Sequence, residues 1–308
     1  MHAIATKEIA KAYKNSKVYA LRNINVCVES GKIFTLLGRN GAGKTTFVRI
    51  CATQLLPTSG SAEVLGHDVI LEPGKIRNKI TVVPQEGRPL RALTPWDHVY
   101  NWLRLRGMDK DESRIRSEQA LYDFDLIKVK DTPAMNLSGG MKQKILVAMA
   151  MATDAEMLFL DEPTIGLDPV SRRQVWKSIK QKRDAGKTII LTTHYMDEAE
   201  SLADELLIIE NGLVIESGTI RALKAKIPQN IRIDISKEGT DLETLKSFGS
   251  VVDTGGNIFR IFTFESNIQE VSSMAMKKNI YFSVSPITLD DVFVYLVNPK
   301  NSGDLNKQ

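Results

Sequence analysis

The chain has 308 residues, of which 43% are hydrophobic and 25% are charged, a composition that excludes a wholly disordered protein. Its length allows one large core and a smaller module. The 41 lysines and arginines exceed the 37 aspartates and glutamates by only four, which is too small and too evenly spread an excess to indicate a nucleic-acid-binding protein.

Signals for membrane insertion and export are missing from the sequence pattern. The longest apolar run, residues 145–152, is much shorter than the roughly 20 residues that a helix needs to cross a bilayer. Residues 1–17 lack the apolar core of a signal peptide. Cys27 and Cys51 have no metal-type spacing and fit a reducing, intracellular setting. We therefore expect a cytoplasmic protein, and another chain must supply any membrane part.

Four short apolar runs, at 33–37, 80–83, 157–160 and 188–193, predict buried strands. Because helical stretches separate them, they predict an α/β core with a parallel sheet that is covered on both faces. Further along the chain, two apolar runs flank Asn-Gly at 211–212, which predicts an antiparallel hairpin.

The segment of about 88–138 has an all-helical pattern. Thr94, Pro95 and Asp97 form a favourable helix start, and a second helix is predicted over 110–124. Since this block lies between two strands of the α/β core, we expect it to be an inserted helical subdomain. His2, His67 and His98 have no partner pattern, and we expect them at the surface.

After residue 223 the pattern changes to that of a small α+β module. The predicted strands are 231–236, 251–254, 258–264 and 280–284, and the predicted helices are 241–248, 267–278 and 289–297. This order, βαββαβ plus a helix, predicts a ferredoxin-like module. We expect three parts: a main domain over 1–223, a second domain over 224–298, and a disordered tail over 299–308.

Residues 38–45 match the complete phosphate-binding loop pattern, and they follow an apolar strand and open a helix. Backbone N–H groups of such a loop converge on phosphate oxygens at a helix N-terminus. Lys44 is expected to bridge the β- and γ-phosphates, and the hydroxyl of Thr45 to bind Mg²⁺. The predicted phosphate contacts are Gly38, Asn40, Gly41, Ala42, Gly43, Lys44, Thr45 and Thr46.

Asp161 and Glu162 follow four apolar residues at the carboxyl end of a predicted strand, where sites form in open α/β sheets. Asp161 is expected to hold Mg²⁺, and Glu162 to act as the general base that polarises the attacking water. Alone, such an acidic pair is as often a helix cap. With the phosphate loop it predicts an enzyme that hydrolyses a nucleoside triphosphate.

Leu137, Ser138, Gly139 and Gly140 precede a helix just before this acidic strand, and they resemble the signature of the ATP-binding cassette (ABC) family. Ser138 and the glycine N–H groups form a second anion site at a helix N-terminus. Because one chain supplies only one γ-phosphate at its own loop, this site needs a nucleotide from elsewhere. In the ABC family, that nucleotide is held by the partner subunit.

The resemblance spans roughly residues 1–223 and implies further roles. Gln85 resembles the glutamine that senses Mg²⁺ and water, and Asp168 the aspartate of the loop that crosses the dimer interface. His194 matches the switch histidine at the γ-phosphate. Tyr13 occupies the place of the aromatic residue that stacks on adenine, and Tyr19 is a weaker candidate. The resemblance thus assigns ATP and Mg²⁺ as cofactors, with Thr45, Gln85 and Asp161 at the metal.

Two positions depart from the common family pattern: Arg39 replaces a frequent proline, and Met141 a frequent glutamine. Met-Lys-Gln after the signature, and Leu-Asp-Asp-Val-Phe at 289–293, resemble one branch of the family, the daunorubicin-resistance-type exporter ATPases. The fold implied is a P-loop NTPase core with an antiparallel β subdomain, an inserted helical subdomain and a small α+β C-terminal domain.

The resemblance implies an ATPase subunit that dimerises head to tail around two MgATP and drives a separate membrane permease, in export, from the inner face of the cell membrane. The partner subunit is a second copy or a related ATPase. An importer ATPase is the closest alternative, and a soluble ABC ATPase of a cytosolic assembly complex is another. A DNA-repair ATPase is disfavoured, because Lys44 and Asp161 are only 161 − 44 = 117 residues apart with no heptad run between them. The sequence does not name the substrate.

Overall fold

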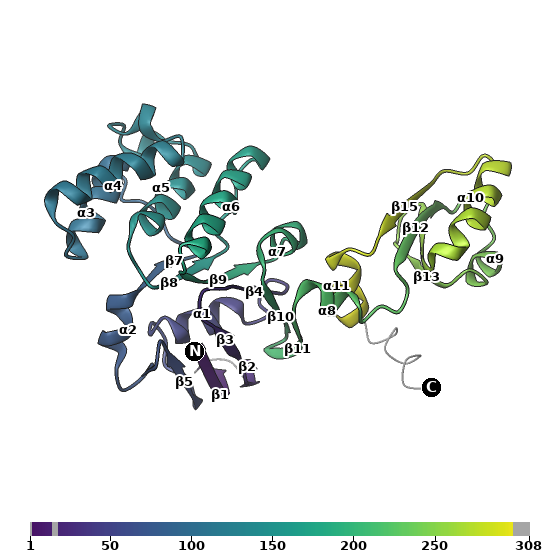
Figure 1. Cartoon of the computed structure of the whole chain (residues 1–308), viewed down its shortest axis with the longest axis horizontal. Coiled ribbons are helices and arrows are strands. Elements are labelled where there is room, and N and C mark those ends of the chain that lie inside the picture. The colour runs from purple at the N-terminus through teal and green to yellow at the C-terminus, as the bar shows by residue number, and fades with distance from the viewer. Residues whose placement is uncertain (1, 14–17, 298–308) are drawn as a thin grey trace. The chain divides into compact units, whose positions relative to one another are not determined.

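The computed structural model describes residues 2–13 and 18–297. The chain divides into two compact units, Met1–Thr219 and Ile220–Gln308, whose elements are labelled in Figure 1. The sequence-predicted boundary after residue 223 falls inside helix α8 (Ile220–Lys224), which contacts helix α11 (Leu289–Val297) of the second unit. The tail at 299–308 lies outside the described residues.

The first unit contains the predicted α/β core and additional strands. Its strands are β1 (His2–Ala12), β2 (Tyr19–Ile24), β3 (Cys27–Glu29), β4 (Ile33–Leu37), β5 (Ser59–Val64), β6 (His67–Asp68), β7 (Ile80–Val83), β8 (Met157–Asp161), β9 (Thr188–Thr193), β10 (Glu205–Glu210) and β11 (Leu213–Gly218). Its helical segments are α1 (Lys44–Cys51), α2 (Pro73–Lys79), α3 (Pro95–Leu105), α4 (Lys110–Asp123), η1 (Ile127–Val129), η2 (Ala134–Asn136), α5 (Gly139–Ala152), α6 (Pro169–Asp184) and α7 (Met196–Leu202).

A central sheet in the order β11-β10-β4-β9-β8-β7 organises this unit. Neighbouring strands from β10 to β7 are parallel, and β11 pairs with β10 in an antiparallel hairpin. Asn211 and Gly212 both have positive φ angles, 51° and 75°, as a two-residue hairpin turn requires. The four predicted buried strands and the predicted hairpin are confirmed.

Two hydrophobic cores lie on the two faces of the central sheet, because successive strand residues point to opposite sides. Phe159 of β8 faces the first core, with α1 and an antiparallel sheet of order β2-β1-β5-β6 that β3 joins at β1. Leu158 and Leu160 face the second core, which α3, α4, α5 and α6 cover. This arrangement of a parallel central sheet, covering helices and a second antiparallel sheet is the predicted P-loop NTPase core with its antiparallel β subdomain.

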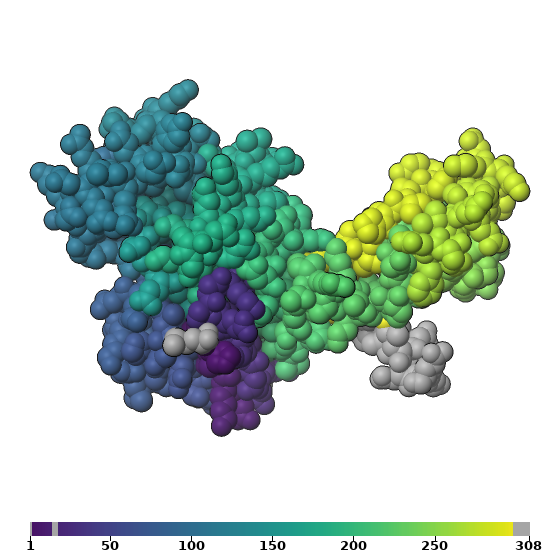
Figure 2. All heavy atoms as spheres, in the orientation of Figure 1, coloured from purple at the N-terminus to yellow at the C-terminus, as the bar shows by residue number. Residues whose placement is uncertain are grey.

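Helices α3 and α4 form the helical block, whose atoms gather at one side of the first unit, away from the purple N-terminal strands (Figure 2). Thr94 and Asp97 make the predicted reciprocal cap at the start of α3. The prediction that His98 lies at the surface is wrong, because its side chain is only 6% exposed. Its Nε2 accepts a hydrogen bond from the N–H of Leu90 (2.8 Å), so that Nδ1 donates to the carbonyl of Thr94 (2.7 Å).

The second unit is a sheet of order β13-β14-β12-β15 in which every described pair is antiparallel. Its elements are α8, β12 (Ile231–Ser236), α9 (Leu242–Lys246), β13 (Ser250–Asp253), β14 (Ile258–Thr263), η3 (Glu265–Asn267), α10 (Ile268–Lys277), β15 (Phe282–Pro286) and α11. Ile233, Ile235 and Ile261 face the helices α9 and α10 across a small core. This strand order and pairing are those expected of a ferredoxin-like module.

The boundaries of β15 and α9 differ most from the sequence prediction. The last strand begins at Phe282 rather than residue 280, since Ile280 packs into the core before the strand starts. Helix α9 spans five residues rather than the eight predicted. Among residues 2–13 and 18–297, no helix combines the length and apolar character needed to cross a membrane.

Candidate functional site

The register of the central sheet brings the carboxyl ends of three strands to one edge. Leu37 at the end of β4 pairs with Thr193 of β9, and Asp161 at the end of β8 pairs with Thr192. The loop 38–43, Glu162 and His194 each directly follow one of these strands. Residues more than 100 positions apart in sequence therefore meet at this edge.

The loop between β4 and α1 needs glycine at two positions for different reasons. At Gly38 a Cβ atom would lie 2.3 Å from the carbonyl oxygen of Ile209, closer than atoms can approach. Gly43, the N-cap of α1, has a φ of 114°, and a Cβ there would lie 2.5 Å from the carbonyl oxygen of Ala20. The neighbouring hairpin and β2 thus pack against the loop backbone and hold it at the start of α1.

Lys44 is the first residue of α1 and is 5% exposed. Its Nζ donates to the carbonyl oxygens of Gly38 (2.8 Å) and Arg39 (3.2 Å) and lies 3.6 Å from Oε1 of Glu162. Burial lowers the pKa of Lys44, and the charge of Glu162 partly opposes that shift. Lys44 therefore bends over its own loop, where phosphate oxygens would provide its charge partner.

Thr45 connects three strand ends. Its hydroxyl lies 3.2 Å from Oε1 of Gln85 and 3.2 Å from Oδ1 of Asp161. The same Oδ1 accepts a hydrogen bond from the hydroxyl of Thr192. Burial raises the pKa of Asp161, while the hydrogen bonds from Thr192 and Thr45 lower it. A hydroxyl, an amide oxygen and a carboxylate thus converge at one point.

Glu162 is 4% exposed and has a φ of 51°, a left-handed conformation that is uncommon for residues other than glycine. Its N–H donates to the carbonyl oxygen (3.1 Å) and the hydroxyl (3.1 Å) of Thr192, which holds the backbone in this conformation. Nδ1 of His194 lies 3.1 Å from Oε2 of Glu162. The carboxylate therefore lies between the ammonium group of Lys44 and the imidazole of His194.

A pocket of about 140 Å³ opens at this edge of the sheet. The predicted site residues that line it are Asn40, Gly41, Ala42, Gly43, Lys44, Thr45, Thr46, Gln85 and Glu162, together with Ala20, which the sequence did not indicate. Tyr13 lies close by, with its hydroxyl 3.3 Å from the hydroxyl of Thr46 and its side chain 42% exposed. Tyr19 is exposed at the start of β2 and has no such contact with the loop among the described residues.

The residues that line this pocket do not include Gly38, Asp161 or His194, which lie beside lining residues, or Ser138, Gly139, Gly140 and Asp168. Ser138 caps α5, and its hydroxyl accepts from the N–H of Met141 at 3.2 Å. Asp168 caps α6, and hydrogen bonds from Ser171 lower its pKa. Gly140 approaches the loop before Asp168, since a Cβ there would lie 3.5 Å from the carbonyl oxygen of Gly166. The two helix starts form a separate, exposed pair.

Sequence reasoning missed two supporting groups. Thr192 forms hydrogen bonds with both Asp161 and Glu162. Its hydroxyl near the carboxyl end of a mostly apolar strand is the sequence feature that could have indicated this role. Glu198 of α7 is fully buried, and its Oε1 accepts from the hydroxyl of Thr164 (2.8 Å) and from Nε1 of Trp176 (2.8 Å). Burial raises the pKa of Glu198. This network holds the loop after Glu162 against α6 and α7. No local sequence motif predicts these hydrogen bonds.

Comparison with known proteins assigns this arrangement to a family. The family model described as ABC transporter matches residues 21–165. The daunorubicin resistance ATP-binding protein DrrA3 of Streptomyces coeruleorubidus is 33% identical over 305 residues, covering 96% of this chain and 95% of that protein. The daunorubicin/doxorubicin resistance ATP-binding protein DrrA of Streptomyces peucetius is 38% identical over 229 residues, covering 74% of this chain and 69% of that protein.

Solved structures show the same fold. An ATP-binding subunit of an ABC transporter has a TM-score of 0.68 at 24% identity, covering 80% of this chain and 98% of its own. A dimeric ATP-binding cassette in a post-hydrolysis state, bound to ADP and phosphate, has a TM-score of 0.66 at 26% identity, covering 70% of this chain and 98% of its own. The chain therefore belongs to the ABC transporter family, as an ATP-binding protein with ATPase activity.

Proposed function

We propose that the chain is the energy-coupling subunit of an exporter, in which two copies close head to tail around two MgATP molecules and drive a separate membrane permease. The proposal rests on one observation: the signature serine lies apart from the residues around the phosphate loop. The phosphate loop and Glu162 line one pocket at the sheet edge, and His194 lies beside Glu162, whereas Ser138 is the cap of a different helix, α5, and lines no part of that pocket. A γ-phosphate held in that pocket therefore meets Ser138 only when a second copy supplies it.

Binding of the nucleotide follows from the loop geometry. The loop N–H groups and the N-terminus of α1 favour the negative charge of the β- and γ-phosphates. Lys44 exchanges its hydrogen bonds with the carbonyls of Gly38 and Arg39 for the phosphate oxygens. Tyr13 supplies an exposed ring beside Thr46 on which the adenine can stack.

The residues at the strand ends fit a magnesium ion. The hydroxyl of Thr45 lies 3.2 Å from the amide oxygen of Gln85 and 3.2 Å from a carboxylate oxygen of Asp161. All three groups offer oxygen ligands, which Mg²⁺ prefers. When bound, Mg²⁺ neutralises charge on the phosphates. Thr192 orients the carboxylate of Asp161 toward that position through its hydrogen bond to Oδ1.

Hydrolysis needs a base for the attacking water, and Glu162 is the carboxylate that lies beside the loop lysine. Its backbone is fixed by Thr192 in a sparsely populated conformation, so that the carboxylate is positioned before the substrate arrives. We assign Glu162 to accept the proton of the water. His194, 3.1 Å from Oε2 of Glu162, orients that carboxylate and contacts the γ-phosphate.

The permease and the direction of transport are inferred from the relatives. Two relatives are named for resistance to daunorubicin, and an ATP-binding subunit that gives resistance to a drug fits export of that drug. A chain without a spanning helix in its described residues depends on another chain to cross the bilayer. We therefore place this subunit on the cytoplasmic face of the membrane, bound to that permease.

Extraction from membranes tests this assignment. The tagged chain, expressed in its host, should elute from detergent-solubilised membranes with an integral membrane protein in a fixed ratio. After reconstitution, vesicles in which the ATPase faces outward should accumulate daunorubicin when MgATP is added, and the Glu162→Gln complex should not. If the chain stays entirely in the soluble fraction with a soluble partner, it is an assembly ATPase rather than a transporter subunit.

A further inference from the structure

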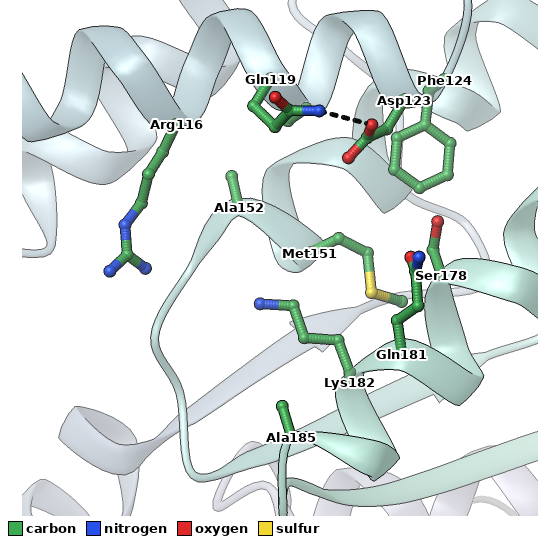
Figure 3. A pocket seen from close by; sticks show the side chains of 11 residues that line it. Arg116, Gln119, Asp123, Phe124, Met151, Ala152, Ser178, Gln181, Lys182 and Ala185 are labelled. Carbon is green, nitrogen blue, oxygen red and sulfur yellow. Dashed lines mark hydrogen bonds between the residues drawn. The ribbon is translucent and has the colours of Figure 1, made fainter.

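A cavity of about 340 Å³ lies within the first unit. Its walls come from α4, from the last turn of α5 and from the second half of α6, as Figure 3 shows. None of the residues that line the nucleotide pocket lines this cavity. Its volume falls within the range of about 300–1,000 Å³ that small-molecule sites occupy.

One part of the cavity is apolar. Ala120 and Phe124 from the end of α4 and Met151 from α5 contribute to its wall, and each is at most 7% exposed. Figure 3 shows the ring of Phe124 and the sulfur-bearing end of Met151 facing the same space. The flexible thioether of methionine adapts to different apolar shapes. This wall can cover the hydrocarbon or aromatic body of a ligand.

The other part is cationic. Arg116 from α4 and Lys182 from α6 extend from opposite walls toward the same side of the cavity (Figure 3). The Nζ of half-buried Lys182 donates to the carbonyl oxygen of Thr153 at 3.1 Å, and no carboxylate of the described residues pairs with it. Burial lowers the pKa of Lys182, the charges of Arg116 and Lys187 lower it further, and the charge of Asp154 partly opposes them. An anion between the two walls would relieve this repulsion.

The nearby acidic groups limit how much negative charge the cavity can accept. Arg116 already pairs with Glu112 (2.5 Å) and lies 3.9 Å from a carboxylate oxygen of Asp154. Asp123 on the wall of α4 accepts a hydrogen bond from Nε2 of Gln119 at 2.7 Å, the dashed line in Figure 3. With these carboxylates present, a singly charged group is accommodated better than a phosphate dianion.

We propose that this cavity binds a small organic carboxylate, with its charged end between Lys182 and Arg116 and its apolar body against Met151 and Phe124. The charge-assisted hydrogen bond to Lys182 gives selectivity for the anion. The apolar contacts supply the remaining affinity. Because the cavity shares no residue with the nucleotide pocket, the ligand binds together with MgATP rather than in place of it.

Calorimetric titration of the full chain with 4-phenylbutyrate and its uncharged analogue 4-phenylbutanamide tests the proposal without any substitution. We expect a Kd on the order of 1 mM for the acid, as is typical of a ligand of this size. The amide should bind roughly tenfold more weakly or worse, because it loses a hydrogen bond between charged groups. Equal affinity for the two compounds, or no binding of the acid near 10 mM, overturns the proposal.

Substitutions locate the binding. Lys182→Met keeps most of the side-chain volume and should weaken binding of 4-phenylbutyrate about tenfold. Lys180→Met, an exposed lysine of the same helix outside the cavity, should leave it unchanged. Arg116→Gln is a second variant should Lys182→Met fail to fold. Identical affinities for the Lys182 and Lys180 variants would place the ligand elsewhere.

Saturating MgATP separates this inference from the proposed function. The affinity for 4-phenylbutyrate should be the same within twofold with and without MgATP, and both variants should bind MgATP as the unmodified chain does. Competition between MgATP and the carboxylate would show that the anion occupies the nucleotide pocket instead, and would contradict the second site while leaving the ATPase assignment intact.

Discussion

The ammonium group of Lys44 lies 3.6 Å from Oε1 of Glu162, and the two side chains are 5% and 4% exposed. A buried pair of opposite charges is costly to desolvate, and it persists where both members are needed for another purpose. Here the lysine begins α1, and the carboxylate directly follows β8, which ends at the same edge of the sheet. In the proposed mechanism a bound nucleotide separates this pair, because its phosphates become the partner of Lys44 and the attacking water becomes the partner of Glu162.

Lys44→Ala should lower the ATPase rate by about a hundredfold or more, since it removes the cation that neutralises charge developing on the phosphates. The substitution also leaves the buried carboxylate of Glu162 without its cation, so the variant should lose about 3–5 kcal/mol of stability but remain folded under the assay conditions. Steady-state phosphate release and circular dichroism measure the two effects. Lys75→Ala, which removes an exposed lysine paired with Glu72, is the matched control and should leave the rate unchanged.

Thr192→Val should lower ATP hydrolysis about tenfold, because Asp161 and the N–H of Glu162 both lose their bond to the Thr192 hydroxyl. Thr188→Val on the same strand removes a buried hydroxyl that accepts from the N–H of Gly31, far from the site. Both variants should lose roughly 1–2 kcal/mol of stability. Chemical denaturation and ATPase assays compare them. If both variants hydrolyse ATP equally well, Thr192 has no positioning role.

Glu198→Gln should flatten the dependence of stability on pH. Burial raises the pKa of Glu198 above 4.5, although hydrogen bonds from Thr193, Trp176 and Thr164 and the charge of Arg172 oppose this shift. The folded state therefore holds the proton more tightly, so the unfolding free energy of the unmodified chain falls as pH rises from 4.5 toward the folded pKa. Denaturation at pH 5 and pH 8 should show that the variant loses less stability over this interval than the unmodified chain does. A constant difference between the two pH values contradicts the assignment.

Asp291→Ala should destabilise the second unit by about 3–5 kcal/mol, because it breaks a buried ion cluster. The carboxylate of Asp291 is fully buried and accepts from Nη1 of Arg260 (2.9 Å), from Nη1 of Arg232 (3.2 Å) and from the N–H of Thr288 (2.9 Å). Asp290→Ala next to it removes a carboxylate that is 57% exposed and 4.0 Å from Arg260, and should cost less than about 1 kcal/mol. Calorimetric unfolding of the two variants, with MgATP binding as the readout of the first unit, tests this difference.

Local patterns in the sequence predict much of this fold. The loop 38–45, the Asn-Gly turn at 211–212 and the cap at Thr94 depend on residues close together in the chain, so their chemistry can be read directly. The strand that begins at Phe282 was predicted to begin two residues earlier. The apolar residue Ile280 suggested a strand position, but it packs into the core before the strand begins.

Groups that act over long sequence separations could not be predicted. Thr192 reaches Asp161 across 31 positions, and Glu198 reaches Thr164 across 34. His98 was also missed, although its partner Leu90 is only eight positions away, because the loop conformation that brings the N–H of Leu90 to it has no sequence pattern. The Leu-Asp-Asp-Val-Phe segment at 289–293 suggested a family branch, but its role in binding Arg260 and Arg232 depends on two strands far from it in sequence.

Light scattering of the Glu162→Gln chain with MgATP tests the central claim most directly. Without the base, ATP is bound but not cleaved, so the account predicts a particle of twice the monomer mass that reverts when ATP is removed. Ser138→Arg in the same background should remain monomeric and still bind ATP, because Ser138 lies outside the chain's own nucleotide pocket. Ser201→Arg, an exposed serine of α7, should still dimerise. A Glu162→Gln chain that stays monomeric with ATP bound, or a Ser138→Arg chain that dimerises equally well, would contradict the head-to-tail site.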